Sequence, residues 1–277
     1  MKINIFPHKL PILMGILNVT EDSFSDGSIY LDTDKALDQA KKLIDQGADI
    51  IDLGAESTRP GAYPVEANVE IERIIPLLSK LKQQHPDILY SIDTRKAEVA
   101  QAAIAAGADI INDISALRYD PNMAEVIAAN PNIKLILMHM QGEPQTMQVA
   151  PHYTNVVSDV LEFFLQRLQF CRDMGINTTR LMLDPGIGFG KNLQHNLELL
   201  SHLASFKTFG LPIVLGASRK SFIHHVISSS PAERIAGSLA AAAFGMMQGV
   251  AILRVHDIAE HVQFMRVFSA IASAAGD

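Results

Sequence analysis

Short apolar runs alternate with longer amphipathic segments along the chain. Eight of these runs are rich in β-branched residues or leucine, and they do not alternate regularly with polar residues. Such runs are typical of strands that are buried on both faces of a parallel sheet. The pattern predicts eight strands, at residues 12–17, 50–53, 89–92, 110–111, 134–138, 181–183, 213–215 and 251–253.

The segments between the predicted strands have helical spacing. The clearest apolar helical face consists of Val156, Val157, Val160, Phe163, Phe164, Leu168 and Cys171. One short repeat is visible, because residues 47–52 recur as residues 107–112 with a single change. Each copy begins with a glycine where a helix should end before a strand, which is the usual position of a left-handed helix cap.

A polar residue closes each predicted strand, and these residues are spaced about 34 apart on average. That spacing is one strand–helix unit, and eight such units close a (β/α)8 barrel. The alternative is a doubly wound open sheet, which would normally carry a glycine fingerprint after the first strand; residues 18–20 have none. The sequence therefore favours an α/β fold with a single TIM barrel. The closing residues are Asn18, Asp52, Asp93, Asn112, His139, Asp184, Ser218 and Arg254.

Composition narrows the functional classes. The chain has 277 residues, of which 48% are hydrophobic and 19% charged, and this excludes a disordered protein. A net charge of −7 argues against a general binder of nucleic acid or of anionic membranes. Cys171 is the only cysteine, so neither an internal disulfide nor a cysteine zinc site can form. With no apolar run of signal-peptide or membrane-span length, we expect a cytoplasmic protein.

Two loops near the end of the chain carry candidate anion-binding residues. In a TIM barrel the carboxyl ends of the strands form the site, and the last two loops often bind phosphate. Arg219 and Lys220 follow the seventh predicted strand, while Arg254 and His256 follow the eighth. These residues suit an anion site, although a solvated charge pair on the rim would give the same pattern.

The other strand ends mix hydrogen-bond donors and acceptors. Such a mixture suits the edge of a flat, nitrogen-rich ring, and Met138 would offer that ring a soft apolar face. Asn18 is a candidate ligand for Mg²⁺, which takes few protein oxygens, or else a simple turn residue. The glycine-rich loop at residues 184–192 is weak evidence for phosphate binding and could equally be a mobile turn. The residues of the mixed set are Asp93, Asn112, Asp184 and Lys220.

Several motifs in order resemble those of bacterial dihydropteroate synthases. The first is Met-Gly-Ile-Leu-Asn-Val-Thr at residues 14–20, followed by Asp-Ser-Phe-Ser-Asp-Gly at 22–27. The resemblance covers about residues 11 to 270 and includes the motifs at residues 54–61, 91–94, 111–113, 137–140, 184–186, 218–221 and 254–257. The chain departs from the family pattern at Glu21, Ala55 and Ala217, where proline, glycine and methionine are usual.

The resemblance implies a single pterin-binding domain over residues 1–277 and a reaction of folate synthesis. The enzyme would join 6-hydroxymethyl-7,8-dihydropterin diphosphate to p-aminobenzoate, giving 7,8-dihydropteroate and pyrophosphate. It also implies a homodimer. A face of small residues would suit either that interface or the core, and it consists of Ala236, Ala240, Ala243 and Met247.

The resemblance also implies roles for single residues at the phosphate end. Asn18 would bind Mg²⁺, Thr58 would bind a phosphate, and Arg59 would contact the substrate. Arg254 and His256 would hold the β-phosphate. The loops at about residues 19–32 and 54–66 would close over the reacting groups.

At the other end of the site, Arg219 and Ser221 would place p-aminobenzoate. The three residues expected to be catalytic are Asp93, Lys220 and Arg254. The pterin would be bound by Asp93, Asn112, Asp184 and Lys220, with Met138 beside it.

Two alternative functions remain at this point. A corrinoid-linked methyltetrahydrofolate methyltransferase is a related pterin-binding barrel, but it would lack the Ser-Arg-Lys-Ser motif at residues 218–221 and the Arg-x-His motif at 254–256. A non-catalytic pterin-binding barrel would tolerate loss of the two long loops, and both are present.

Overall fold

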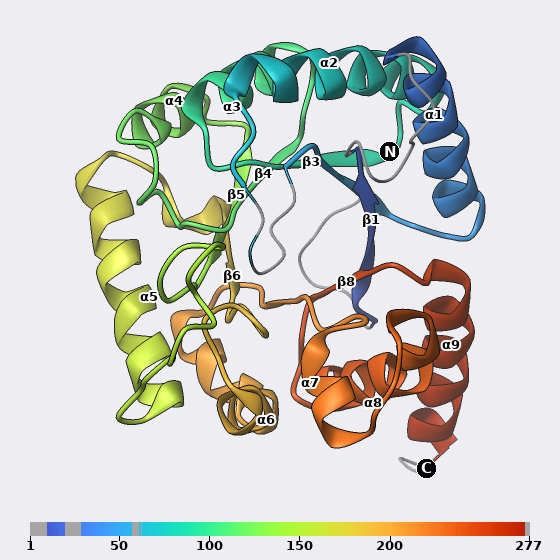
Figure 1. Ribbon diagram of the computed structural model, residues 1–277, viewed down its shortest axis with the longest axis vertical. Coiled ribbons are helices and arrows are strands. Elements are labelled where there is room, and N and C mark those ends of the chain that lie inside the picture. Colours follow the sequence, from blue (N-terminus) through green and yellow to red (C-terminus); the bar gives the residue numbers. More distant parts are fainter. Residues whose placement is uncertain (1–9, 20–28, 57–60, 62, 275–277) are drawn as a thin grey trace.

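The structure, a computed structural model, describes residues 10–19, 29–56, 61 and 63–274. Within these residues eight parallel strands form one sheet in the order β6-β5-β4-β3-β2-β1-β8-β7. A parallel bridge between Leu183 and Ile213 joins the β6 end to the β7 end, so the sheet closes into a barrel (Figure 1). The predicted TIM barrel is confirmed, and the open doubly wound sheet is excluded.

The strands agree closely with the apolar runs in the sequence. They are β1 (Ile12–Asn18), β2 (Ile50–Gly54), β3 (Leu89–Asp93), β4 (Ile110–Asp113), β5 (Lys134–Met138), β6 (Leu181–Asp184), β7 (Val214–Leu215) and β8 (Ile252–Val255). The expectation that each strand closes at its polar residue is wrong for three of them. Asp52, Asn112 and Arg254 lie inside β2, β4 and β8, because those strands continue past them.

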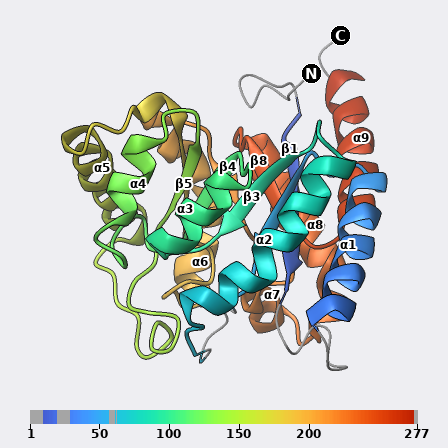
Figure 2. The same cartoon turned by 90° about the horizontal axis from the view of Figure 1, so that it is seen from above.

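Helices surround the barrel, with α7 and α8 on the side opposite α2 and α3 (Figures 1 and 2). The predicted amphipathic helix is α5, whose first turn is capped by the Asn155 side chain accepting the Ser158 amide at 2.9 Å. Cys171 is buried on its inner face. In the part of the chain described, every helix is too short or too polar to cross a bilayer. The α-helices are α1 (Ile29–Asp45), α2 (Ala67–Gln84), α3 (Ala97–Ala105), α4 (Met123–Ala129), α5 (Val156–Asp173), α6 (Leu193–Ser201), α7 (Ser221–Val226), α8 (Ile235–Met247) and α9 (Ile258–Ala274).

The inside of the barrel has an apolar lower layer. Residues two apart on a strand point to the same face of the sheet. The side chain directly above an inward-pointing residue therefore belongs to the residue two positions later in the strand. The residues two positions beyond Ile50, Ile110 and Ile252 are Asp52, Asn112 and Arg254, so the next layer is polar. The lower layer is one buried cluster of Ile12, Met14, Ile50, Leu89, Ile110, Ile136, Met182, Val214 and Ile252.

The sequence repeat lies at the lower end, where the strands begin. Gly47 and Gly107 both have positive φ, 105° and 98°, and each ends the connection before a strand, as predicted. The aspartate two residues later has the same task in both copies. Asp49 Oδ2 accepts the Leu13 amide at 2.9 Å, and Asp109 Oδ2 accepts the Tyr90 amide at 3.0 Å. In each copy of the repeat, the aspartate thus binds the amino end of the preceding strand, β1 or β3.

Candidate active site

A cleft lies at the carboxyl ends of the strands, directly above the apolar layer. Six residues predicted to bind substrate line it together, although they come from five strands and one loop. This confirms the expectation that the strand ends converge on one site. The lining residues are Asp93, Asn112, Ile114, Met138, Asp184, Gly186, Ile187, Phe189, Gly216, Lys220 and Arg254.

Arg254 is bound to two aspartates at the bottom of the cleft. Its Nε donates to Asp52 Oδ2 at 2.6 Å, and its Nη2 donates to Asp93 Oδ2 at 2.8 Å. Burial alone would lower the pKa of Arg254, but the two carboxylates raise it. Burial raises the pKa of Asp93 to about 7, with Arg254 opposing that rise and Asp52 adding to it. The guanidinium is therefore fully charged and held in place before any substrate arrives.

Asp184 and Lys220 form the opposite wall of the cleft. Asp184 Oδ1 accepts the Gly186 amide at 2.7 Å. A Cβ atom at Gly216 would lie 3.6 Å from Asp184 Oδ2, so the glycine leaves that oxygen accessible. The Lys220 Nζ lies 4.0 Å from the centre of the Phe189 ring. Burial raises the pKa of Asp184, while burial and then Arg254 lower the pKa of Lys220 to about 8.

Apolar side chains lie next to these charges. Met138 is buried together with Ile114, Met140, Met147 and Phe189 in a small separate cluster beside the cleft. A planar ring placed against Asp184 would thus meet polar groups at its edge and thioether or aromatic carbon on its faces.

His256 is held at the rim by Ser218. The Ser218 hydroxyl accepts the His256 amide at 3.2 Å and lies 3.1 Å from the ring Nδ1. The hydroxyl hydrogen is then available to Nδ1, which favours the tautomer with hydrogen on Nε2. Burial, followed by the positive charges of Arg254 and Arg219, lowers the pKa of His256 to about 4. The imidazole is neutral at pH 7 and donates one hydrogen bond.

Arg219 is less available than the sequence suggested. The Arg219 guanidinium pairs with Asp257, with Nε 3.0 Å from Oδ2, so part of the charge expected in the four-residue anion site is already balanced. Its backbone has a positive φ of 57°, and Arg234 binds its carbonyl at 2.9 Å. Ser221, by contrast, is exposed at the first position of α7.

Asn18 is the last residue of β1 and is partly buried. A Cβ atom at Gly54 would lie 3.5 Å from Asn18 Oδ1 and 3.4 Å from the Asp93 Cβ, so the amide oxygen is directed toward the cleft. The described residues include no group of three or more acidic, histidine or cysteine side chains that could enclose a metal. Thr58 and Arg59 lie outside the described residues.

Comparison with known proteins bears directly on this cleft. Residues 14–256 match the pterin binding enzyme family. The dihydropteroate synthase of Escherichia coli (strain K12) is 47% identical over 264 residues, which cover 95% of this chain and 93% of the relative. The chain belongs to the dihydropteroate synthase family. The related methyltransferase and the non-catalytic barrel are therefore set aside.

Solved structures of dihydropteroate synthases have the same fold. The Yersinia pestis enzyme with a sulfonamide drug complex superposes with a TM-score of 0.91 at 42% identity, covering 98% of this chain and 96% of that one. The Xanthomonas albilineans enzyme in complex with 7,8-dihydropteroate superposes with a TM-score of 0.85 at 35% identity, covering 98% and 95%.

The glycine-rich loop of this synthase packs tightly against the segment after β5. A Cβ atom at Gly186 would lie 1.9 Å from the His139 carbonyl oxygen, so only glycine fits there. The buried Lys191 Nζ binds the Gly186 and Phe189 carbonyls, both at 2.9 Å, and lies 2.9 Å from His139 Nδ1. Burial lowers the pKa of Lys191 to about 7. The sequence left this loop as either a phosphate-binding loop or a mobile turn. The structure shows another role for its glycines, which is to allow close packing against the segment after β5.

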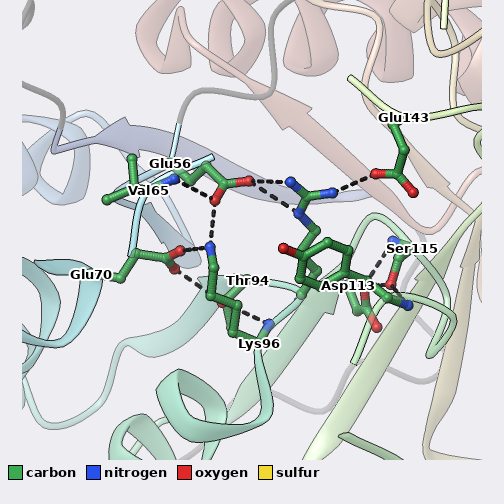
Figure 3. A network of polar contacts seen from close by, with 10 residues as sticks. Glu56, Val65, Glu70, Thr94, Lys96, Asp113, Ser115 and Glu143 are labelled. Carbon is green, nitrogen blue, oxygen red and sulfur yellow. Dashed lines mark hydrogen bonds and ion pairs between the residues drawn. The ribbon is translucent and has the colours of Figure 1, made fainter. Parts of the chain in front are cut away.

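A buried ionic network lies beside the cleft (Figure 3). Lys96 pairs with both Glu56 and Glu70, and Thr94 Oγ1 donates to Glu70 Oε2 at 3.0 Å. Glu56 follows β2, so the network binds that strand end to α2 and to the loop after β3. The other oxygen contacts of Glu56 are the Val65 amide at 3.1 Å and Arg95, which also reaches Glu143 at 2.6 Å.

Sequence analysis missed three groups of this site. Asp52 was noted only as a strand end, although its position two residues after Ile50 was a signal that it points inward. Lys191 looked like an ordinary loop lysine, and the sequence carried no sign of its burial. The network around Lys96 joins residues 40 positions apart, which no local pattern reveals.

Proposed function

We propose that this chain joins 6-hydroxymethyl-7,8-dihydropterin diphosphate to p-aminobenzoate, forming 7,8-dihydropteroate and pyrophosphate. The observation that carries the proposal is the combination of a ring-binding cleft with a fixed cation at its edge. Asp184, Lys220, Met138 and Phe189 line this cleft together with Arg254. Membership of the dihydropteroate synthase family supports the same reaction.

Pterin recognition follows from the donors and acceptors of the cleft. The Asp184 carboxylate would accept N–H groups from the edge of the ring, while Asn112 and Lys220 would donate to its nitrogen and oxygen acceptors. Asp184 is buried and Lys220 is partly buried, so a mismatched ring would leave a buried charge without a partner. This favours pterins strongly over rings with another pattern.

The reaction itself is proposed to be dissociative. The bond between the pterin methylene carbon and the diphosphate oxygen breaks, and both electrons leave with the pyrophosphate. Arg254 and the neutral His256 are placed to stabilise the charge that grows on that leaving group. The Asp93 carboxylate would stabilise the positive charge left on the dihydropterin. The amine nitrogen of p-aminobenzoate then bonds to the methylene carbon and loses a proton to water.

A bound Mg²⁺ would neutralise charge on the diphosphate, and the donor set fits that ion. Mg²⁺ favours oxygen ligands and often takes only one or two from the protein, completing its shell with phosphate and water. Asn18 supplies one amide oxygen directed toward the cleft, consistent with such a partial site. Asn18 would therefore hold the ion together with the substrate.

For p-aminobenzoate we propose a position near the rim. The exposed hydroxyl of Ser221 and the charge of Arg219 would receive its carboxylate. Because Arg219 is already paired with Asp257, it would act as part of a neutralised pair and orient the ligand more than attract it. Thr58 and Arg59 are proposed to contact the phosphate and the substrate, as the family motif implies.

The decisive experiment measures pyrophosphate release together with dihydropteroate formation. With the pterin diphosphate, Mg²⁺ and p-aminobenzoate present, we expect both products in equal amounts. Omitting p-aminobenzoate should abolish dihydropteroate and slow pyrophosphate release. Pyrophosphate release that ignores p-aminobenzoate, with no dihydropteroate formed, would contradict the proposed reaction.

We further propose that the chain forms a homodimer through the α8 side of the barrel. The small-residue face is not core: Ala236 and Ala240 are exposed, and Met247 is 72% exposed. Beside it, apolar side chains of α6, α7 and α8 line a groove that includes Phe244, which is 55% exposed. A continuous apolar surface of this kind favours an interface between copies.

Sedimentation analysis should give a particle of twice the 30.2 kDa chain mass. Phe244→Glu should shift it to the monomer mass, because a charge would be placed inside the interface. Leu165→Glu is the matched control, since Leu165 is 52% exposed on α5, away from the groove. A monomeric wild-type protein would overturn the dimer proposal.

A further inference from the structure

Asp52 lies one layer below the cleft. It is the third residue of β2, and its side chain has no exposed surface. It is not one of the residues that line the cleft, and Arg254 lies between it and the opening. Asp52 therefore acts on a substrate only through other side chains.

One oxygen of Asp52 organises two residues of the pterin cleft. Its Oδ2 accepts Nε of Arg254 at 2.6 Å and Nδ2 of Asn112 at 3.3 Å. The carboxylate thus links β8 to β4 across the inside of the barrel. Both partners are expected to touch the pterin diphosphate, so Asp52 sits at the point where their positions are set.

A carboxylate at this depth is unfavourable for folding. Its other oxygen, Oδ1, is buried and has no hydrogen-bond partner among the described residues. Ser91 lies opposite Asp52 in the register of β2 and β3, and its Oγ is also buried without a hydrogen-bond partner among the described residues. Two residues earlier on β2, the apolar Ile50 fills the equivalent place in the lower layer. Burying a charged side chain lowers stability, whereas burying an apolar one does not. The benefit of an aspartate at position 52 must therefore come from the residues that it binds.

The two bonds of Arg254 differ in their exposure to substrate. Nε and Nη2 form one edge of the guanidinium, and each binds a different aspartate. Asp93 lines the cleft, so a pterin bound there competes for the oxygen that Nη2 now holds. Asp52 lies beyond the reach of the ligand, and its bond to Nε can persist throughout the reaction.

From this geometry we propose that Asp52 is the positioning residue for Arg254. It holds the guanidinium from below, so that Arg254 exchanges its bond to Asp93 for a diphosphate oxygen without leaving its place. The proposal rests on the proposed function, because it assumes that Arg254 acts on the departing pyrophosphate. It assigns no contact between Asp52 and the substrate.

The test compares Asp52→Asn in the wild-type and Arg254→Met backgrounds. In the wild-type background we expect kcat to fall by about 10-fold to 100-fold, as for a catalytic group misplaced by about 1 Å. The KM for p-aminobenzoate should change less than about threefold, because the change acts on the leaving group. In the Arg254→Met background the same substitution should cause no further loss of kcat, because residues that act as a unit are not additive, and any effect through Asn112 should appear in the KM for the pterin diphosphate.

The proposal would be overturned if Asp52→Asn lowered kcat by the same factor in both backgrounds. It would also be overturned if the KM for p-aminobenzoate changed by as large a factor as kcat. Asp109→Asn is the control, a carboxylate at the lower end of the barrel that should leave kcat unchanged. If Asp52→Asn alone does not fold, Arg254→Met against the double variant still decides, since the double variant carries no charge at either position 52 or position 254. Absence of pyrophosphate release by the wild-type protein would instead contradict the proposed function.

Discussion

Asp184→Asn should weaken binding of the pterin substrate by about 2–5 kcal/mol and leave the barrel folded. The carboxylate is 5% exposed, and one of its oxygens is already used by the Gly186 amide. The other oxygen is the proposed acceptor for the ring. Replacing it with an amide nitrogen would set a donor against the N–H groups of the pterin and remove the charge that balances Lys220. Calorimetric titration with the diphosphate-free pterin alcohol would measure the loss.

The same titration with Asp109→Asn separates a local effect from a general one. Asp109 is also an aspartate in a charged pair, with Lys82 at 2.6 Å, but it lies at the opposite end of the strands. Its variant should bind the pterin normally. Unchanged pterin affinity in a folded Asp184→Asn variant would remove Asp184 from the binding site.

Lys96→Met should lower the free energy of unfolding by about 3–5 kcal/mol, because it leaves Glu70 buried without its cation and leaves Glu56 with Arg95 alone. Glu70 has no exposed surface, and burial already raises its pKa. Without Lys96 that pKa should rise further. A carboxyl group with a raised folded pKa stabilises the native state at low pH, and this contribution is lost as the pH rises through that value. The deficit should therefore be smaller at pH 5.5 than at pH 8 in urea unfolding.

Lys80→Met provides the matched control for that experiment. Lys80 pairs with Asp34 at 3.1 Å, but both side chains are well exposed. Surface pairs of this kind contribute at most about 1 kcal/mol. Adding Glu70→Leu to Lys96→Met should recover part of the lost stability and flatten the pH dependence. Equal, small effects of the two lysine substitutions would mean that the Lys96 network stabilises little.

The fold could be predicted because each strand is short, apolar and self-contained in the sequence. The run at residues 134–138 coincides with β5, and Met138, its last residue, lines the cleft. Asp93 and Asp184 were also placed correctly, because each lies an even number of residues after an inward-facing apolar residue of its strand, Leu89 or Met182. For these residues, the alternation of side chains along the strand determines both the sequence pattern and the position in the barrel.

Other features depend on which side chains meet across the barrel, and single segments do not encode that. Arg254 was expected to be a free phosphate ligand, but its depth in β8 places it between Asp52 and Asp93. Arg219 was expected beside it and instead pairs with Asp257. Arg254, whose side chain is 16% exposed, needs a counter-charge close by, whereas the Arg219 side chain is 34% exposed and pairs at the rim. The partners, up to 202 residues away in sequence, are fixed only by closure of the sheet.

The apolar layer that fills the lower half of the barrel has a consequence for the movement of ligands. Nine side chains, none more than 3% exposed, close that half to water and to any substrate. Both reactants must then enter, and both products leave, at the end where the strands finish. Of the proposed binding groups, Asn112 and Arg254 lie within strands and Asp184 lies at the end of one, whereas Ser221 is exposed at the start of α7. A p-aminobenzoate molecule bound at the rim would block the pterin from entering its proposed binding cleft. Access from one end alone thus favours an obligatory sequence, in which the pterin enters first and the joined product leaves as a whole.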